Sequence, residues 1–325
     1  MAFVNVRPPE RARSRLESKL KQPRLALAGL PTIISQTFYT APSSLRDEVV
    51  VWVARSPQER DELLSLLRLW FHKDDNGNGN GPMMVTMSEE SLRTPMMPRA
   101  FLALGEGRPV WLLATTADLR LPLPSPELLK KSVLNLTTGQ AASPALMSQG
   151  LAQMGYEFNT MVTEPGTFAR RGGIVDVWPH GMPNPTRLDI LDQSIEKIAT
   201  LNWKTQRNRE ELQHVSIPPC ELPKAKESSV ADYLEPLGAK VHVLMPDPVE
   251  LETLDVHAHE ALLRFEQFPT VIFQPFADTD APFDLQAAPL FHRDFQKLGA
   301  FLSRHAGWTI WLCTARAYDL RERVE

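Results

Sequence analysis

The sequence predicts an α/β domain that is split between the first and last thirds of the chain and interrupted by a small, mainly antiparallel α+β unit. At both ends of the chain, buried β-prone runs alternate with amphipathic helical runs, which is the pattern of a layered α/β sheet. The middle third instead has short β-prone runs separated by Pro, Gly and Asn turns, as expected of antiparallel strands. With 325 residues and 43% hydrophobic content, the chain is long enough to bury two or three cores.

These patterns divide the chain into four parts. The predicted parts are a basic N-terminal helix over residues 1–24, the first part of the α/β domain over 25–126, the inserted unit over 127–212 and the second part of the α/β domain over 213–325.

The first third begins with a predicted helix over residues 25–41, followed by a buried strand over 49–53. An amphipathic helix comes next, with Ser56 as its N-cap and Pro57 as its first residue. The Asn-Gly repeat within residues 73–82 predicts a surface loop. The other predicted elements of the two outer parts are strands over 110–114, 241–245, 271–274 and 308–313, helices over 248–268 and 293–305, and a Pro-rich crossover over 121–126.

The inserted unit contains three consecutive β-prone segments. In the second of them, strand periodicity places Arg187, Asp189 and Leu191 on one face, and the apolar Leu188 and Ile190 on the other. A basic, an acidic and an apolar group displayed together would suit a protein-docking face. The three segments cover residues 174–178, 187–191 and 195–201.

A glycine pair precedes the first of these segments. Gly172 and Gly173 follow Arg170 and Arg171 directly, and they predict a bulge or a residue with positive φ that re-aims the arginines. An ordinary hairpin with solvated arginines is the alternative interpretation of the same residues.

Three motifs of the middle third carry a resemblance to a known family. The run EPGTFARRGGIVDVWP at residues 164–179, with RLDILD at 187–192 and TQR at 205–207, resembles the second domain shared by the bacterial repair proteins UvrB and Mfd, the transcription-repair coupling factor. The resemblance covers most of residues 25–325 and is strongest in the middle. It implies a split P-loop-NTPase-like domain interrupted by a UvrA-binding domain. Further matching segments lie at residues 108–119, 151–156, 217–223 and 232–234.

The resemblance also implies which residues contact UvrA. The matching positions are Arg171 in the Arg-Gly-Gly turn, Arg187 at the start of the next strand, and Leu191, where the family often has Phe. Gly172 and Asp189 complete the predicted site. The loss of the aromatic ring at Leu191 puts the apolar contact in more doubt than the two arginines, whose planar guanidinium groups suit pairing with carboxylates.

The resemblance carries further implications for a longer parent protein. Such a parent would be an ATP-dependent DNA translocase that engages RNA polymerase and double-stranded DNA through domains beyond this sequence. A C-terminal domain of that parent would mask the docking face. Because the sequence stops within a predicted helix, we expect it to be the N-terminal part of a longer chain.

The expected place of a phosphate-binding loop lacks the necessary residues. UvrB has a Gly-x-x-x-x-Gly-Lys-(Ser/Thr) loop there, whose N–H groups and lysine bind phosphate. Here residues 28–35 are AGLPTIIS, with Gly29, Leu30 and Pro31 at its start, no lysine, and a proline that removes a donor. We therefore expect a degenerate, inactive nucleotide site, no catalytic residue, no metal and no cofactor, and we predict that this chain is not an enzyme.

Composition limits the remaining classes of function. A net charge of −4 and a pI near 6.1 argue against a dedicated nucleic-acid binder, although the first 24 residues are basic. One rival is still a nucleic-acid-binding module that uses this N-terminal helix with Arg170, Arg171 and Arg187 as a phosphate stripe, and another is a stand-alone regulatory protein-binding domain. No apolar run approaches the ~20 residues that span a bilayer, so we expect a cytoplasmic, monomeric protein with no membrane partner.

Overall fold

The computed structural model describes residues 10–20, 22–28, 30, 33–41, 43–71, 81–225, 227–274 and 295–304. The chain divides into two compact units, residues 1–283 and 284–325. In the second unit the described part is one helix, α11 (Phe295–Arg304). The predicted loop over 73–82 lies almost entirely outside the described residues, and the predicted strand over 308–313 and the helix after it lie wholly outside them.

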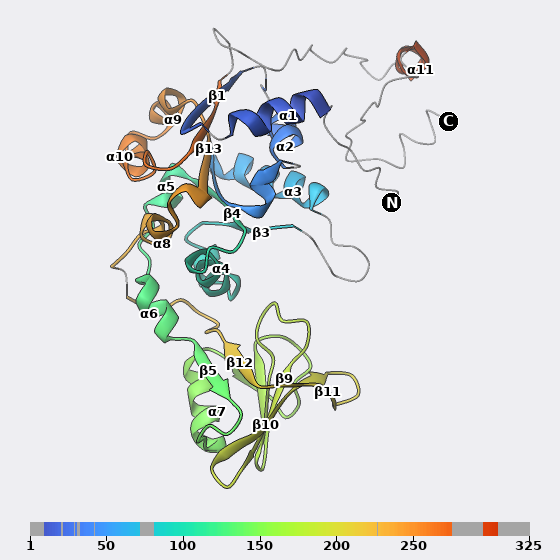
Figure 1. Ribbon diagram of the computed structural model, residues 1–325, viewed down its shortest axis with the longest axis vertical. Helices are drawn as coiled ribbons and strands as arrows, with labels where there is room; N and C mark the ends of the chain where they lie inside the picture. Colours follow the sequence, from blue (N-terminus) through green and yellow to red (C-terminus); the bar gives the residue numbers. More distant parts are fainter. Residues whose placement is uncertain are drawn as a thin grey trace. The chain divides into compact units, whose positions relative to one another are not determined.

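Six parallel strands form the sheet of the α/β domain, in the order β1-β14-β13-β2-β4-β3. Figure 1 shows that strands from both ends of the sequence, blue and orange, lie in this one sheet, as predicted for a split domain. Every residue of β2 and β4 is buried, because helices cover both faces of a parallel sheet. The strands are β1 (Arg24–Ala28), β2 (Val49–Ala54), β3 (Met83–Thr86), β4 (Val110–Thr115), β13 (Val241–Pro246) and β14 (Thr270–Gln274).

Alternate residues of each strand pack into two hydrophobic cores, one on each face of this sheet. Trp52 and Trp111 belong to one core, whereas Val51 and Leu112 belong to the other, which also contains Phe101. The helices of the domain are α1 (Glu10–Lys19), α2 (Ile33–Thr40), α3 (Pro57–Trp70), α4 (Met96–Gly105), α5 (Thr116–Leu119), α8 (Val230–Leu234), α9 (Pro248–Leu254) and α10 (Ala258–Leu263), with 3-10 turns at Ser44–Asp47, Ser91–Arg93 and Glu235–Lys240.

Local signals account for the start of α3. The Ser56 hydroxyl accepts a hydrogen bond from the Glu59 N–H, and Pro57 occupies the first turn, where its missing donor costs nothing. The predicted cap is therefore confirmed.

Two helix predictions need correction, and tertiary contacts explain both. Residues 25–41 are not one helix, because Arg24–Ala28 form β1, whose parallel pairing with β14 buries Leu25 and Leu27. Residues 248–268 form two short helices rather than one. The chain is extended at Asp255 (φ −138°, ψ 112°), whose carboxylate accepts hydrogen bonds from Thr116 and Arg120.

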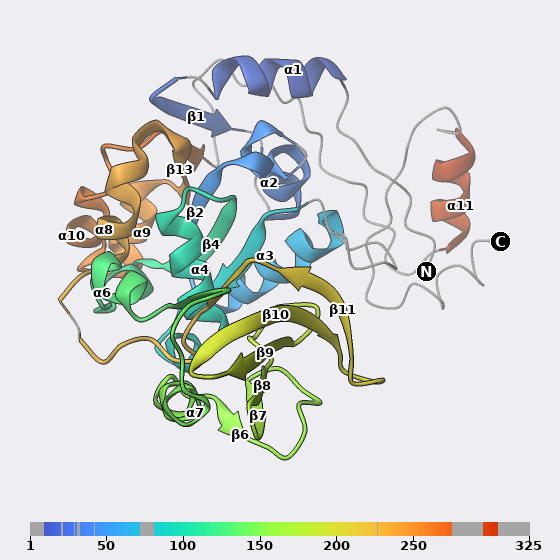
Figure 2. The ribbon, with the colours of Figure 1, turned by 60° about the horizontal axis from the view of Figure 1, so that its bottom comes forward.

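The inserted unit is built on a second six-stranded sheet, in the order β11-β10-β9-β8-β7-β6, which Figure 2 shows strand by strand. All pairs are antiparallel except β6 with β7. These strands are β6 (Glu157–Phe158), β7 (Thr167–Arg171), β8 (Ile174–Val177), β9 (Thr186–Leu191), β10 (Ser194–Asn202) and β11 (Arg207–Leu212).

A helix and a small second sheet complete this unit. Met147 and Leu151 of α7 (Pro144–Gln153) pack in one core with Val175, Leu188 and other residues of the large sheet, so α7 covers one of its faces. The small sheet pairs β5 (Leu134–Thr137) with β12 (His214–Ile217), and α6 (Pro126–Lys131) precedes it. Because β12 and Cys220 share this core, the packing of the unit extends beyond the predicted end at residue 212.

Helix α3 allows a test of the packing in the core that contains Trp52 and Trp111. Leu63 is fully buried, whereas Leu69 on the same helix is 60% exposed. We expect Leu63→Ala to lower the free energy of unfolding by about 2–5 kcal/mol, because it leaves a cavity in the core. Leu69→Ala should change it by less than about 0.5 kcal/mol. Urea unfolding followed by circular dichroism measures both, and equal losses would contradict this packing.

Candidate functional site

The face of the large sheet opposite α7, called here the outer face, carries the predicted docking residues. In β9, Leu188 and Ile190 are buried in the core, Arg187 and Asp189 are half-buried and Leu191 is exposed. The alternation predicted for this strand is thus confirmed.

Strand register extends this face onto the neighbouring strands. Ile174 of β8 lies opposite Asp189, and Arg171 of β7 lies opposite Ile174. Lys197 of β10 lies on the other side of Asp189 and forms an ion pair with Glu211. The outer face therefore has a transverse row that alternates basic, apolar, acidic and basic side chains.

The glycine pair forms the turn between β7 and β8. Gly172 has a φ of +60°, which confirms the predicted positive φ. A Cβ on Gly173 would lie 2.4 Å from the carbonyl oxygen of Ile190 in β9, so only glycine allows the turn to approach β9 this closely. The Ile190 N–H donates to the Gly173 carbonyl at 2.8 Å. The turn thus sets the pairing that brings Arg171 and Ile174 onto one row.

Arg187 differs from the other predicted contacts, because its guanidinium is engaged within the domain. It donates to both carboxylate oxygens of Asp176, at 2.7 and 2.8 Å. It also reaches the Gln206 carbonyl at 3.3 Å and the Asn208 side chain at 3.4 Å. The side chains of Arg187 and Asp176 are only 15% and 4% exposed. The hydrogen bonds that Arg187 donates to the Asp176 carboxylate raise the pKa of Arg187, although its partial burial acts to lower that pKa. Arg187 therefore ties β8, β9 and the β10–β11 turn together.

Part of the outer face is covered by the domain itself. Val162, Ala169 and Trp178 form a small buried cluster there, and Trp203 packs on Trp178 with ring centroids 6.0 Å apart. Arg171, Ile174, Asp189 and Leu191 lie outside this cluster, and we call these four residues the open strip.

Two features of the open strip were not evident from the sequence. Ile174 is 37% exposed. The sequence could have indicated this, because Ile174 directly follows the glycine turn and, two residues before Asp176, lies on the same face of β8. One carboxylate oxygen of Asp189, Oδ1, is buried without a hydrogen-bond partner among the described residues. The strip thus combines an exposed apolar residue with an incompletely paired carboxylate.

The proposed phosphate stripe is interrupted. Arg170 lies opposite Val175, which belongs to the core face, so Arg170 and Arg171 lie on opposite faces of β7. Arg187 is held by Asp176. The three arginines therefore do not form one continuous row.

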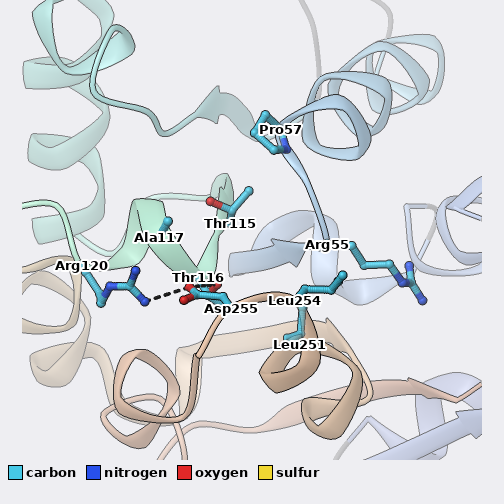
Figure 3. Close-up of a pocket in the computed structure, with 9 residues that line it drawn as sticks. All are labelled: Arg55, Pro57, Thr115, Thr116, Ala117, Arg120, Leu251, Leu254 and Asp255. Carbon is cyan, nitrogen blue, oxygen red and sulfur yellow. Dashed lines mark hydrogen bonds and ion pairs between the residues drawn. The ribbon is translucent and has the colours of Figure 1, made fainter. Parts of the chain in front are cut away.

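A second candidate site lies at the carboxyl ends of β2, β4 and β13, the edge at which open parallel sheets bind ligands. A cavity of about 290 Å³ lies there, and Figure 3 shows the residues after these strands that line it. In Figure 3 the Arg120 guanidinium approaches the Asp255 carboxylate, while Arg55 extends away from it. The lining residues are Arg55, Pro57, Thr115, Thr116, Ala117, Arg120, Leu251, Leu254 and Asp255.

The charged side chains that line this cavity form ion pairs with each other or with residues beside it. Arg55 pairs with Glu59 at 2.6 Å and with Glu250 at 2.7 Å, and Arg120 pairs with Asp255 at 2.8 Å. Burial raises the pKa of Asp255, but hydrogen bonds from Thr116, from a backbone N–H and from Arg120 outweigh it and lower the pKa to about 2. These groups fasten α9 to the sheet edge, which leaves little charge available for a ligand.

Of the three residues predicted to start a degenerate nucleotide loop, Gly29, Leu30 and Pro31, the structure describes Leu30. That residue is 1% exposed, and its carbonyl accepts a hydrogen bond from the Gln36 side chain at 3.0 Å. Gly29 and Pro31 lie outside the described residues. Across the described ranges, no group of three His, Cys, Asp or Glu side chains could hold a metal ion. None of the described helices is long and apolar enough to cross a bilayer.

Removal of Arg187 tests its internal role. Arg187→Ala would leave the Asp176 carboxylate buried without its partner, so we expect the free energy of unfolding to fall by about 3–5 kcal/mol. Arg171→Ala, at an exposed position of the same domain, should change it by less than about 0.5 kcal/mol. Urea unfolding of both variants gives the answer. An Arg187→Ala variant as stable as wild type would show that the ion pair does not brace the sheet.

Comparison with known proteins finds similarity over the middle of the chain. The model of the UvrB interaction domain family matches residues 134–222. The chain is 33% identical over 148 residues to a transcription-repair-coupling factor of Bacillus subtilis (strain 168), a stretch that is 44% of this chain and 13% of that relative. It is 28% identical over 141 residues to a transcription-repair-coupling factor of Staphylococcus aureus (strain bovine RF122 / ET3-1), covering 42% of this chain and 12% of the relative. Residues 134–222 thus match the UvrB interaction domain family, and the chain is similar to transcription-repair-coupling factors over somewhat less than half of its length.

Proposed function

We propose that this chain is a non-catalytic docking module that binds UvrA through its inserted domain and serves transcription-coupled repair. The observation that carries the proposal is the family match over residues 134–222, the same segment that presents the open strip. In this proposal the module brings UvrA, and with it nucleotide excision repair, to RNA polymerase stalled at a lesion.

The open strip supplies suitable chemistry for a protein partner. The exposed Arg171 guanidinium is planar and can pair with a carboxylate through two hydrogen bonds. Its Nη2 donates to the Thr160 carbonyl at 3.0 Å, which holds the side chain in place before binding. Leu191, 62% exposed, supplies apolar area beside it. Asp189 adds an acidic group that disfavours partners with the wrong charge pattern.

Arg187 has a different part in this proposal. Its guanidinium is largely buried and bonded to Asp176, so it supports the outer face from within. A binding defect in an Arg187 variant would therefore mix a loss of contact with a loss of structure.

We extend the proposal to the split α/β domain and to the longer relatives. The domain would be a degenerate P-loop-NTPase-like fold that positions the inserted domain without binding nucleotide. The matched stretch spans only about an eighth of the relatives, so contacts of a parent protein with RNA polymerase and double-stranded DNA stay proposals for other domains. A nucleic-acid-binding role for this chain is less well supported, because Arg170, Arg171 and Arg187 do not form one row.

Titration against purified UvrA tests the docking proposal. We expect the wild-type chain to bind, and Arg171→Ala to weaken the affinity by about tenfold or more, because a partner carboxylate would lose its counter-charge. Salt should be varied in parallel, since phosphate contacts to DNA would show a steep salt dependence. Lack of UvrA binding, together with salt-sensitive DNA binding, would favour the nucleic-acid module instead.

A second measurement tests the non-catalytic assignment. The loop at residues 28–35 has no lysine, so we expect neither saturable ATP binding nor ATP hydrolysis by this chain. Isothermal titration with Mg-ATP and a phosphate-release assay measure the two activities. Saturable binding that a substitution of Gly29 abolishes would refute the degenerate-loop argument.

A further inference from the structure

Two apolar side chains of the open strip are exposed next to each other. Ile174 is 37% exposed and Leu191 is 62% exposed. Ile174 lies directly opposite Asp189, so Leu191, two residues further along β9, is its diagonal neighbour on the same face. Diagonal neighbours lie about 7 Å apart, within reach of long side chains. No side chain intervenes from the turn, because the turn positions are Gly172 and Gly173.

The surroundings distinguish this pair from scattered surface apolar residues, which are normal in soluble proteins. Elsewhere on the outer face, Val162, Ala169 and Trp178 cover the sheet with a buried cluster. Ile174 lies instead between the exposed Arg171 and Asp189 in the strand register, and Leu191 follows Asp189 on the same face of β9. An apolar centre flanked by charged groups is the usual layout of a protein–protein contact.

Conformational entropy also favours Ile174 as a contact. Its β-branched side chain is already restricted at χ1 within the strand, so it loses little freedom when a partner covers it. Arg171, with four rotatable side-chain bonds, loses more. Apolar contact at Ile174 therefore adds to affinity at a small entropic cost.

We propose that Ile174 is a further contact residue of the UvrA-binding face, and that it forms one apolar anchor with Leu191. The inference rests on the proposed function and adds the chemistry of the partner surface. That surface presents an apolar side chain to the Ile174–Leu191 pair and a carboxylate to Arg171. Ile174 thereby supplies the apolar area that Leu191, which has no aromatic ring, provides only in part.

Affinity measurements on single variants test the contact. We expect Ile174→Ala to raise the Kd for UvrA by about tenfold, the typical size for a central apolar contact. Ile174→Thr keeps the β-branched shape and strand propensity while removing apolar area, so it should also weaken binding if the contact is apolar. The matched control is Leu146→Ala. Leu146 is 69% exposed on α7, which covers the other face of the sheet, so this variant should bind like wild type.

A double-mutant cycle tests whether Ile174 and Leu191 act as one anchor. The combined loss in Ile174→Ala/Leu191→Ala should be smaller than the product of the single losses, by more than about twofold, because adjacent contacts are not independent. Strictly multiplicative losses would overturn the shared anchor. Normal binding by Ile174→Ala, with weak binding by Arg171→Ala, would overturn the role of Ile174 and leave the proposed function standing. No binding by the wild-type chain would overturn both.

Discussion

Pairing between β13 and β2 is the constraint on which the rest of the structure depends. These strands come from opposite sides of the insertion, yet Val241 to Leu244 lie in parallel register with Val49 to Trp52. Because this pairing joins the two parts of the α/β sheet, the two ends of the insertion must lie close to each other. The antiparallel pairing of β5 with β12 meets this requirement, since it joins the entry and exit of the inserted domain. A long insertion is thus accommodated without interrupting the buried parallel sheet.

Within the inserted domain, the side chains that brace the sheet differ from those proposed to contact a partner, although both sets lie on the outer face. The Arg187–Asp176 pair is nearly buried, and Arg187 connects β8, β9 and the β10–β11 turn. Arg171 and Leu191 are exposed at the other end of the same face. A buried, bidentate ion pair costs much to break, whereas an exposed arginine contributes little to stability until a partner removes it from water. This separation would let the proposed contact residues vary while the sheet keeps its register.

At the carboxyl edge of the parallel sheet, a position suited to ligand binding is occupied by side chains that hold the structure together. In open α/β sheets this edge usually exposes polar groups to a ligand. Here Arg55 and Arg120 are bonded to acidic side chains, and Thr116 donates to Asp255 at 2.6 Å. The same contacts interrupt the helix predicted over residues 248–268. Charge that could have met a ligand holds α9 against the sheet edge instead.

The sequence by itself determined the features that depend on neighbouring residues. It predicted the α/β alternation at both ends of the chain, the helix start at Ser56 and Pro57, a bulge or a positive φ at the Gly172–Gly173 pair, and the shared face of Arg187, Asp189 and Leu191. Periodicity, caps and turns are local, so they can be read without a partner strand. Tertiary structure decided what depends on residues far apart in the chain. It made residues 24–28 a strand, paired Arg187 with Asp176, and left Ile174 exposed while covering Ala169 on the same face. Strand register and packing set these outcomes, because a side chain's partners and exposure follow from the strands beside it rather than from its own segment.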